Sequence, residues 1–196
     1  MDLTTITPDP TALKALAHPV RLRMLGLLRS EGPATATTLA QRLGLNSGAT
    51  SYHLRQLDQH GFIEDDTERG NGRDRWWRAA HQSTRTDRSS EATPEGREAS
   101  DAFGQAITVL HTEALQRATE ESPTRPAEWR LASTYSDWEL RLTAERAEEL
   151  VHTLDRLVSG WQEADAGTEG TADLVVQLHT FPRPGTLPPA DLEDNR

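Results

Sequence analysis

Cysteine is absent from this chain of 196 residues. Its absence excludes disulfides, thiolate metal sites, iron–sulfur clusters and a cysteine nucleophile. No apolar run approaches the roughly 18 residues that a membrane-spanning helix requires. The first residues show neither the basic nor the apolar part of a signal peptide. We therefore expect a soluble cytoplasmic protein without a membrane partner.

The motifs that usually accompany catalysis are also missing. The sequence has no G-x-x-x-x-G-K phosphate loop, no G-x-G-x-x-G fingerprint and no Ser/His/Asp constellation. Its carboxylates are plentiful but scattered over polar faces. We expect a protein that is not an enzyme, with no catalytic residues and no cofactor.

Lysine is nearly absent, since Lys14 is the only one and the other basic residues are arginines. The charge is distributed unevenly along the chain. Residues 1–81 carry ten basic and nine acidic side chains, whereas residues 82–196 carry eleven basic and 22 acidic ones. The formal net charge of −10 therefore belongs to the second part. This asymmetry indicates two units with different partners.

The segment that follows a loose arm at residues 1–9 predicts two helices. From Pro10 onward, apolar residues recur at helical spacing as far as Leu28. Pro19 interrupts this stripe and fits best as the first residue of a second helix, where proline is tolerated. Gly32 and Pro33 end the segment.

Two further short helices are predicted directly afterwards. The first is capped at Thr35 or Thr37 and ends at Gly44, and the second is capped at Asn46 or Ser47. A tight Gly-Leu-Asn turn joins the two helices. Two short helices joined in this way are typical of a helix-turn-helix motif.

Residues 62–80 predict a β-hairpin after the second of these helices. Asn71-Gly72 is a strong signal for a two-residue hairpin loop, which makes the numbers of paired residues sum to 143. That register pairs Glu68 with Arg75, Arg69 with Asp74, and Asp65 with Arg78. It also places Ile63 and Trp76 on one face and Trp77 on the other. Three opposite-charge pairs favour the hairpin, although chance in a charge-rich stretch is the alternative.

In a helix-turn-helix motif the second helix lies in the major groove of DNA. We expect Thr50, Leu54 and Leu57 to form its buried face. Short hydroxyls can bind phosphates or base edges, and arginine can bind guanine in bidentate fashion. Arginines near the hairpin tip can enter a minor groove or bind phosphate. The candidate DNA-binding residues are Ser47, Gly48, Thr50, Ser51, Tyr52, His53, Arg55, Arg69, Asn71, Arg73 and Arg75.

The alternative is that these residues form an ordinary solvated helix face. The adjacent hairpin with arginines at its tip favours the DNA-binding interpretation. One such unit has few cations, so a single copy is expected to bind DNA weakly. Tight binding then requires a dimer on a two-fold symmetric site.

About a third of the chain resembles the ArsR-type winged helix-turn-helix transcriptional regulators. The resemblance rests on LKALAHPVRLRML (13–25), TLAQRLGL (38–45), TSYHLRQL (50–57), GFI (61–63) and GNGRDRWW (70–77). Members of this family are typically homodimeric repressors that release DNA when an inducer binds. By position, the resemblance implies DNA-reading residues at Ser47, Gly48, Ser51, Tyr52, His53 and Arg55, with Arg69 and Arg73 on the wing.

The sequence departs from the metal-sensing members of this family, because their thiolate motif requires cysteine. The nearest substitutes are His152 with Asp155 on one helix, and His111 near Glu113. Two such ligands are too few without a symmetry mate. We therefore expect no metal site.

The remaining residues predict a smaller α/β region. A polar linker at 82–94 precedes a helix at about 95–120, and residues 182–196 resemble a disordered tail. Residues 138–142 and 174–181 are predicted strands on either side of a helix capped by Thr143. Trp138, Trp161 and Phe181 are candidates for an apolar effector pocket that binds a small-molecule inducer. The alternative is that such stripes are core or a dimer seam.

The predicted fold is mainly α with β. It comprises a winged helix-turn-helix domain at 10–81 and an α/β region at 95–181 with a long dimerisation helix. The leading hypothesis is a sequence-specific regulator, a homodimeric repressor that binds an inverted repeat in double-stranded DNA through the recognition helix (46–60) and the wing (62–80). The alternative is a winged-helix interaction module that regulates a protein partner through the acidic C-terminal half.

Overall fold

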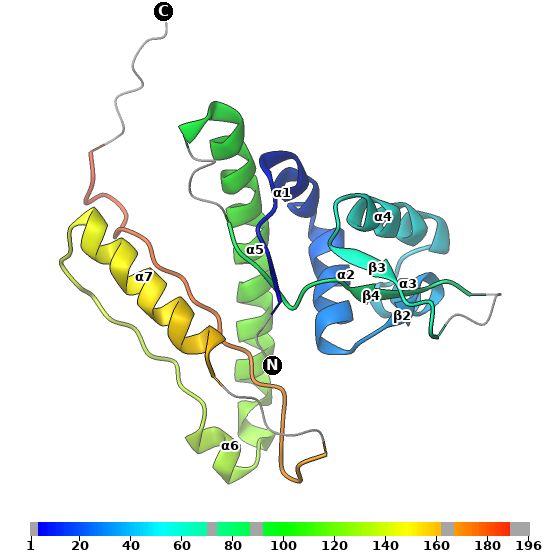
Figure 1. Cartoon of the computed structure of the whole chain (residues 1–196). Helices are drawn as coiled ribbons and strands as arrows, with labels where there is room; N and C mark the ends of the chain where they lie inside the picture. The colour runs from blue at the N-terminus through cyan, green and yellow to red at the C-terminus, as the bar shows by residue number, and fades with distance from the viewer. Residues whose placement is uncertain (1–3, 70–73, 87–91, 162–166, 189–196) are drawn as a thin grey trace, which may run out of the picture. The chain divides into compact units, whose positions relative to one another are not determined.

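The computed structural model describes residues 4–69, 74–86, 92–161 and 167–188 (Figure 1). The chain forms two compact units, Met1–Asp137 and Trp138–Arg196. The first unit contains a three-stranded sheet, a two-stranded sheet and most of the described helices. No helix within the described ranges is both long enough and apolar enough to cross a membrane.

The first two helices begin at Pro10 and Pro19, as the sequence predicted. Helix α1 is Pro10–Leu16 and helix α2 is Pro19–Ser30, each with a proline in its first turn. The Asp9 carboxylate accepts a hydrogen bond from the backbone N–H of Ala12 at 2.8 Å. His18 Nδ1 accepts one from the N–H of Val20 at 3.2 Å. These caps satisfy backbone donors that a helix leaves unpaired at its start.

The helix-turn-helix prediction is confirmed. Helix α3 (Ala36–Leu43) is capped by Thr35, and helix α4 (Ser47–Gln59) is capped by Asn46. Gly44 lies between them with φ of 64°, a left-handed conformation that glycine adopts without steric cost. This turn sets the direction in which α4 leaves α3.

The two strands of the wing belong to a three-stranded sheet. Its order is β2 (Ala34–Thr35), β4 (Trp76–Ala79) and β3 (Ile63–Asp65), all antiparallel neighbours. The sequence predicted the hairpin of β3 and β4 but not β2, because two residues are too short for a visible alternation. Strand β2 ties the start of α3 to the wing.

The predicted register of the hairpin is wrong by one residue. Ile63 pairs with Ala79, Glu64 with Arg78, and Asp65 with Trp77, so the numbers sum to 142. A slip of one residue moves every side chain to the opposite face of a strand. Trp77, and not Trp76, therefore shares the face of Ile63, and its large ring is buried in the core. This register buries the indole, and the predicted turn at Asn71-Gly72 lies outside the described residues.

The core of this unit gathers apolar side chains from every helix of the winged domain. Its buried members are Ala12, Leu16, Leu22, Met24, Leu25, Leu28, Leu39, Leu54, Leu57, Phe62, Ile63 and Trp77. The long helix α5 (Pro94–Glu121) packs along α1 and α2 (Figure 1). Ala99 of α5 is fully buried, and Phe103 lies against the same core. The helix predicted at about 95–120 is thus joined to the winged domain by apolar packing.

The segment expected to be a loose arm is partly ordered. Strand β1 (Thr5–Ile6) pairs in parallel with β5 (Ser83–Thr84), which lies in the predicted linker. Arg29 of α2 holds this linker from the other side. Its guanidinium donates to the carbonyl of His81 at 2.9 Å and to the hydroxyl of Thr84 at 2.8 Å. These pairings are long-range, and a local sequence pattern does not reveal them.

The first unit ends with short elements that the sequence did not predict. A 3₁₀ turn (Ser122–Thr124) follows α5, and α6 (Ala127–Leu131) follows the turn. Arg125 donates to the carbonyl of Ala118 at 2.6 Å and so folds this turn back on the end of α5.

The second unit contains one helix, α7 (Ala144–Ser159), among its described residues. Thr143 caps it as predicted, by accepting a hydrogen bond from the N–H of Arg146 at 3.3 Å. The strands predicted at 138–142 and 174–181 are not formed. Both segments are irregular, because no neighbouring strand pairs with them. Of the predicted tail, residues 189–196 lie outside the described residues.

Candidate nucleic-acid interface

Helix α4 has one apolar face and one polar face. Leu54 and Leu57 are buried in the core as predicted. Thr50 is 0% exposed, and its hydroxyl donates to the carbonyl of Asn46 at 3.0 Å. Its prediction as a DNA-binding residue is therefore corrected: the hydroxyl is used inside the helix and cannot reach DNA.

The polar face of α4 presents the other predicted residues to solvent. Ser47, Gly48, Tyr52 and Arg55 are exposed, while Ser51 and His53 are half-buried. Arg55 forms no ion pair with any acidic side chain in the described part of the chain. Its guanidinium is therefore available to a ligand, which is the property that binding a base or a phosphate requires.

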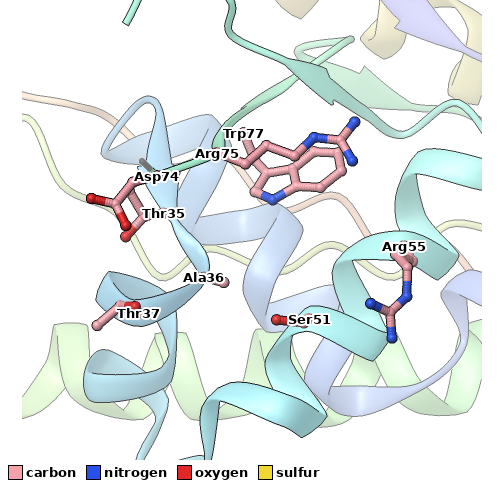
Figure 2. Close-up of a pocket in the computed structure, with 8 residues that line it drawn as sticks. All are labelled: Thr35, Ala36, Thr37, Ser51, Arg55, Asp74, Arg75 and Trp77. Carbon is pink, nitrogen blue, oxygen red and sulfur yellow. The ribbon is translucent and has the colours of Figure 1, made fainter. Parts of the chain in front are cut away.

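A hollow of about 230 Å³ separates this polar face from the wing (Figure 2). Ser51 and Arg55 of α4 border one side, and the stacked side chains of Arg75 and Trp77 border another. The lining residues are Thr35, Ala36, Thr37, Ser51, Arg55, Asp74, Arg75 and Trp77. The contribution of β2 and α3 was not predicted, because only the fold brings these residues beside the wing.

The described arginines of the wing are largely neutralised by carboxylates. Arg75 Nε lies 2.8 Å from Asp65 Oδ2, and its guanidinium carbon lies 3.8 Å from the centre of the Trp77 ring. Arg69 lies 3.6 Å from Asp66, a buried carboxylate. The other two candidates on the wing, Asn71 and Arg73, lie outside the described residues. Arg69 and Arg75 are thus ion-paired, as the sequence predicted, but with Asp66 and Asp65 in place of Asp74 and Glu68.

A pair of histidines fixes the other side of α4. The ring of His53 lies 4.6 Å from the ring of His18, and Tyr52 lies edge-on to His53. Burial lowers the pKa of both histidines, and the charge of Arg21 lowers each further. His53 Nδ1 is buried and has no hydrogen-bond partner among the described atoms. His53 therefore packs against His18 in an environment that favours its neutral form, and its role in DNA binding stays a prediction.

The predicted effector-pocket residues lie in the second unit. Trp138, Trp161 and Phe181 are 78%, 76% and 72% exposed, respectively. In the single chain these three rings are exposed to solvent. The effector pocket that they were expected to line therefore stays a prediction. No cluster of three metal-ligating side chains occurs among the residues that the structure describes.

The comparisons with known proteins concern the winged domain. Residues 16–66 match a family model described as a helix-turn-helix domain. The chain is 38% identical over 52 residues to the HTH-type transcriptional regulator YgaV of Escherichia coli, covering 26% of this chain and 52% of that protein. It is 41% identical over 56 residues to the HTH-type transcriptional regulator NmtR of Mycobacterium tuberculosis, covering 29% and 46%. The chain thus spans about half the length of these relatives.

Among solved structures, that of a mutant of Lactococcus lactis ZitR is 17% identical, with a TM-score of 0.34. That match covers 74% of this chain and 84% of the other.

The first unit is therefore a winged helix-turn-helix domain extended by a long helix. The sequence matches confirm its resemblance to the ArsR-type winged helix-turn-helix transcriptional regulators over residues 16–66. The relatives are regulators and not enzymes.

Proposed function

We propose that this protein is a homodimeric transcriptional repressor that binds an inverted-repeat operator in double-stranded DNA. Helix α4 enters the major groove and the wing contacts the adjacent backbone. The observation that carries the proposal is Arg55, an exposed guanidinium on α4 without a carboxylate partner in the described residues. A small-molecule inducer acting on the C-terminal region controls release.

Arg55 and Ser51 are spaced to act together. They lie four residues apart on α4, which places them one turn apart on the same face. Both side chains border the hollow beneath the wing (Figure 2). Arginine reads guanine through two parallel hydrogen bonds, and a serine hydroxyl binds phosphate or a base edge. Arg55 is therefore assigned to base recognition and Ser51 to positioning.

The low number of free cations supports the homodimer. Arg75 and Arg69 are engaged by Asp65 and Asp66, so each winged domain offers few unpaired charges to phosphate. Phosphate contacts supply most of the affinity of non-specific DNA binding. Two copies on half-sites about 34 Å apart double the number of phosphate contacts. Such a dimer requires an operator with two-fold symmetry.

Fluorescence anisotropy tests the proposal. Labelled DNA from upstream of the protein's own gene is titrated against a scrambled duplex, with wild type, Arg55→Ala and Arg78→Ala. Arg78 is a matched control, because it is an exposed arginine whose Nε lies 2.8 Å from Glu64. We expect specific binding that Arg55→Ala removes and Arg78→Ala retains. Equal binding of both duplexes by wild type would contradict the proposal.

One observation favours a second function. Many large apolar side chains of residues 138–188 are exposed, a property of surfaces that meet a protein partner. A winged-helix module that regulates another protein through its acidic C-terminal half would have this feature. It predicts equal and weak binding to both duplexes in the same titration.

A further inference from the structure

Residues 138–142 form an extended segment with the sequence Trp-Glu-Leu-Arg-Leu immediately before α7. Apolar and charged residues alternate strictly, as on a strand with one covered face. Yet Trp138, Leu140 and Leu142 are all exposed, and no strand pairs with the segment in the described chain. The segment has the pattern of a paired strand and lacks its partner.

The sequence of this segment is self-complementary. When two copies run antiparallel with Leu140 opposite Leu140, the numbers of paired residues sum to 280. Trp138 then faces Leu142 of the other copy, and Glu139 faces Arg141. All six apolar side chains lie on one face of the pair, and both charge pairs lie on the other. Aromatic–aliphatic and opposite-charge pairs are those that stabilise an antiparallel ladder.

We propose that residues 138–142 pair with the same segment of a second copy across a two-fold axis at Leu140. A two-fold interface requires that one patch be complementary to itself, and this register meets that requirement. The proposal names the contact surface of the homodimer proposed above. It rests on the dimer and not on DNA recognition by α4.

Charge complementarity favours a second copy, because it pairs both Glu139 and Arg141, whereas the single chain pairs Glu139 with Arg183 and offers Arg141 no carboxylate partner among the described residues. The other extended apolar segment, 174–181, contains no Asp, Glu, Lys or Arg that could pair with Glu139 and Arg141. In the single chain Glu139 lies 3.8 Å from Arg183, and both side chains are largely exposed. Such a pair is worth little in water. Exchanging it for Arg141 of a second copy therefore costs little.

The length of the segment fits a short symmetric pair. Thr143 caps α7 directly after Leu142, so the strand ends there. Further along α7, Leu157 and Val158 are exposed and lie on the apolar stripe of that helix. When two segments pair, the apolar face of the two-stranded ladder must be shielded from water by other apolar side chains. The two α7 helices carry apolar side chains that can supply it.

The absence of cysteine allows a direct test by cross-linking. In the proposed register, Leu140→Cys places two thiols directly opposite each other, with Cα atoms about 5 Å apart. This separation lies within the range for a disulfide. In Glu139→Cys the two new cysteines are offset by two residues along the strand, about 8 Å apart, and cannot be bridged without backbone movement.

We expect the purified full chain carrying Leu140→Cys to form a disulfide-linked dimer under mild oxidation. Glu139→Cys should remain unlinked, as should Leu131→Cys, which is a matched exposed leucine on α6 at 88% exposure. Equal linkage of all three variants, or none in Leu140→Cys, would overturn the proposal. The second outcome would point to another partner, such as the chain's own residues 174–181 or a different protein.

A charge exchange tests the register independently. In the Leu140→Cys background, Glu139→Arg or Arg141→Glu alone sets like charges opposite each other at two positions. We expect either to slow cross-linking by roughly tenfold. The double variant restores both opposite-charge pairs and should restore the rate. A double variant as slow as the single ones would contradict the register.

These outcomes are separable from those of the proposed function. Specific DNA binding by a chain that fails to cross-link leaves the repressor proposal intact and removes this dimer contact. Cross-linking by a chain that binds all DNA equally removes the repressor proposal and retains the contact.

Discussion

The centre of the imidazole ring of His53 on α4 lies 4.6 Å from that of His18, the N-cap of α2. Arg21 lies close enough for its charge to disfavour protonation of both rings. The contact joins α4 to the start of α2, and the neutral form of both rings is favoured there.

The histidine pair predicts a loss of stability in weak acid. The folded pKa of each histidine is lowered from 6.5, first by burial and then by neighbouring charge. Between the folded and unfolded pKa values the unfolded chain binds more protons, so stability rises with pH there. The contribution is complete above about pH 6.5 and is lost as the pH falls through the folded pKa.

Urea unfolding between pH 8 and pH 5.5 measures this effect. We expect the free energy of unfolding to fall towards pH 5.5 in wild type and to fall less in His53→Gln. His152→Gln is a control, because that exposed histidine belongs to α7. Identical pH profiles for wild type and His53→Gln would show that the pair does not titrate as described.

The corrected register of the wing predicts different roles for two adjacent tryptophans. Trp77 is buried in the core, whereas Trp76 is only partly buried on the opposite face. Trp77→Ala should lower the free energy of unfolding by about 3–5 kcal/mol. Trp76→Ala should lower it by no more than about 1 kcal/mol. The reverse order in denaturant unfolding would support the register that sums to 143.

Local signals in the sequence were sufficient for the helices of the winged domain. Pro19 marked the start of α2, and the caps of α3 and α4, Thr35 and Asn46, were each one of two candidates. These signals act within one turn, so no tertiary information was needed. The register of the wing was different, because the prediction relied on a turn signal at Asn71, which lies outside the described residues, and did not include the burial of Trp77 in the core.

For the candidate site and the C-terminal half, too, the sequence predicted local features but not the contacts between distant residues. Helical periodicity correctly placed Arg55 and Ser51 on the polar face of α4. The observed register changes the partner of Arg75 from Glu68 to Asp65, so the sequence predicted an ion pair for Arg75 but named the wrong carboxylate. The segment 138–142 has the alternation of a strand and 174–181 is rich in apolar residues, but a strand also requires a neighbour, and the sequence pattern does not identify one.

The ion pairs of the wing predict unequal contributions to DNA binding. Arg75 is held by Asp65 at 2.8 Å and Asp58 at 3.7 Å, whereas Arg55 has no such partner in the described residues. Arg75→Ala should therefore weaken binding less than Arg55→Ala. Asp65→Asn should strengthen binding, since it removes a negative charge and releases Arg75. Anisotropy at one fixed salt concentration compares the three, and weaker binding by Asp65→Asn would argue against this account.

The hydrogen bonds of Arg29 link α2 to the segment that follows the wing. Burial lowers its pKa to about 10, so it stays charged at neutral pH while donating to His81 and Thr84. Arg29→Met should cost about 1.5–3 kcal/mol of stability, because hydrogen bonds from a charged group are lost. It should also speed amide exchange at Arg85, whose N–H donates to Ile6.

Arg23→Met is the matched control on the same helix. Arg23 forms an exposed ion pair with Glu113, and such pairs contribute at most about 1 kcal/mol. Equal losses of stability in the two variants would show that Arg29 does not hold the segment as the structure indicates.

The central claim is that α4 reads DNA through Arg55, and base substitution in the bound operator tests it most directly. Each base pair of a bound half-site is changed in turn, and the affinities of wild type and Arg55→Ala are compared by anisotropy at constant salt. The account predicts that wild type loses about 1–3 kcal/mol at one guanine position and that Arg55→Ala is indifferent there. Retention of the full preference by Arg55→Ala would contradict it.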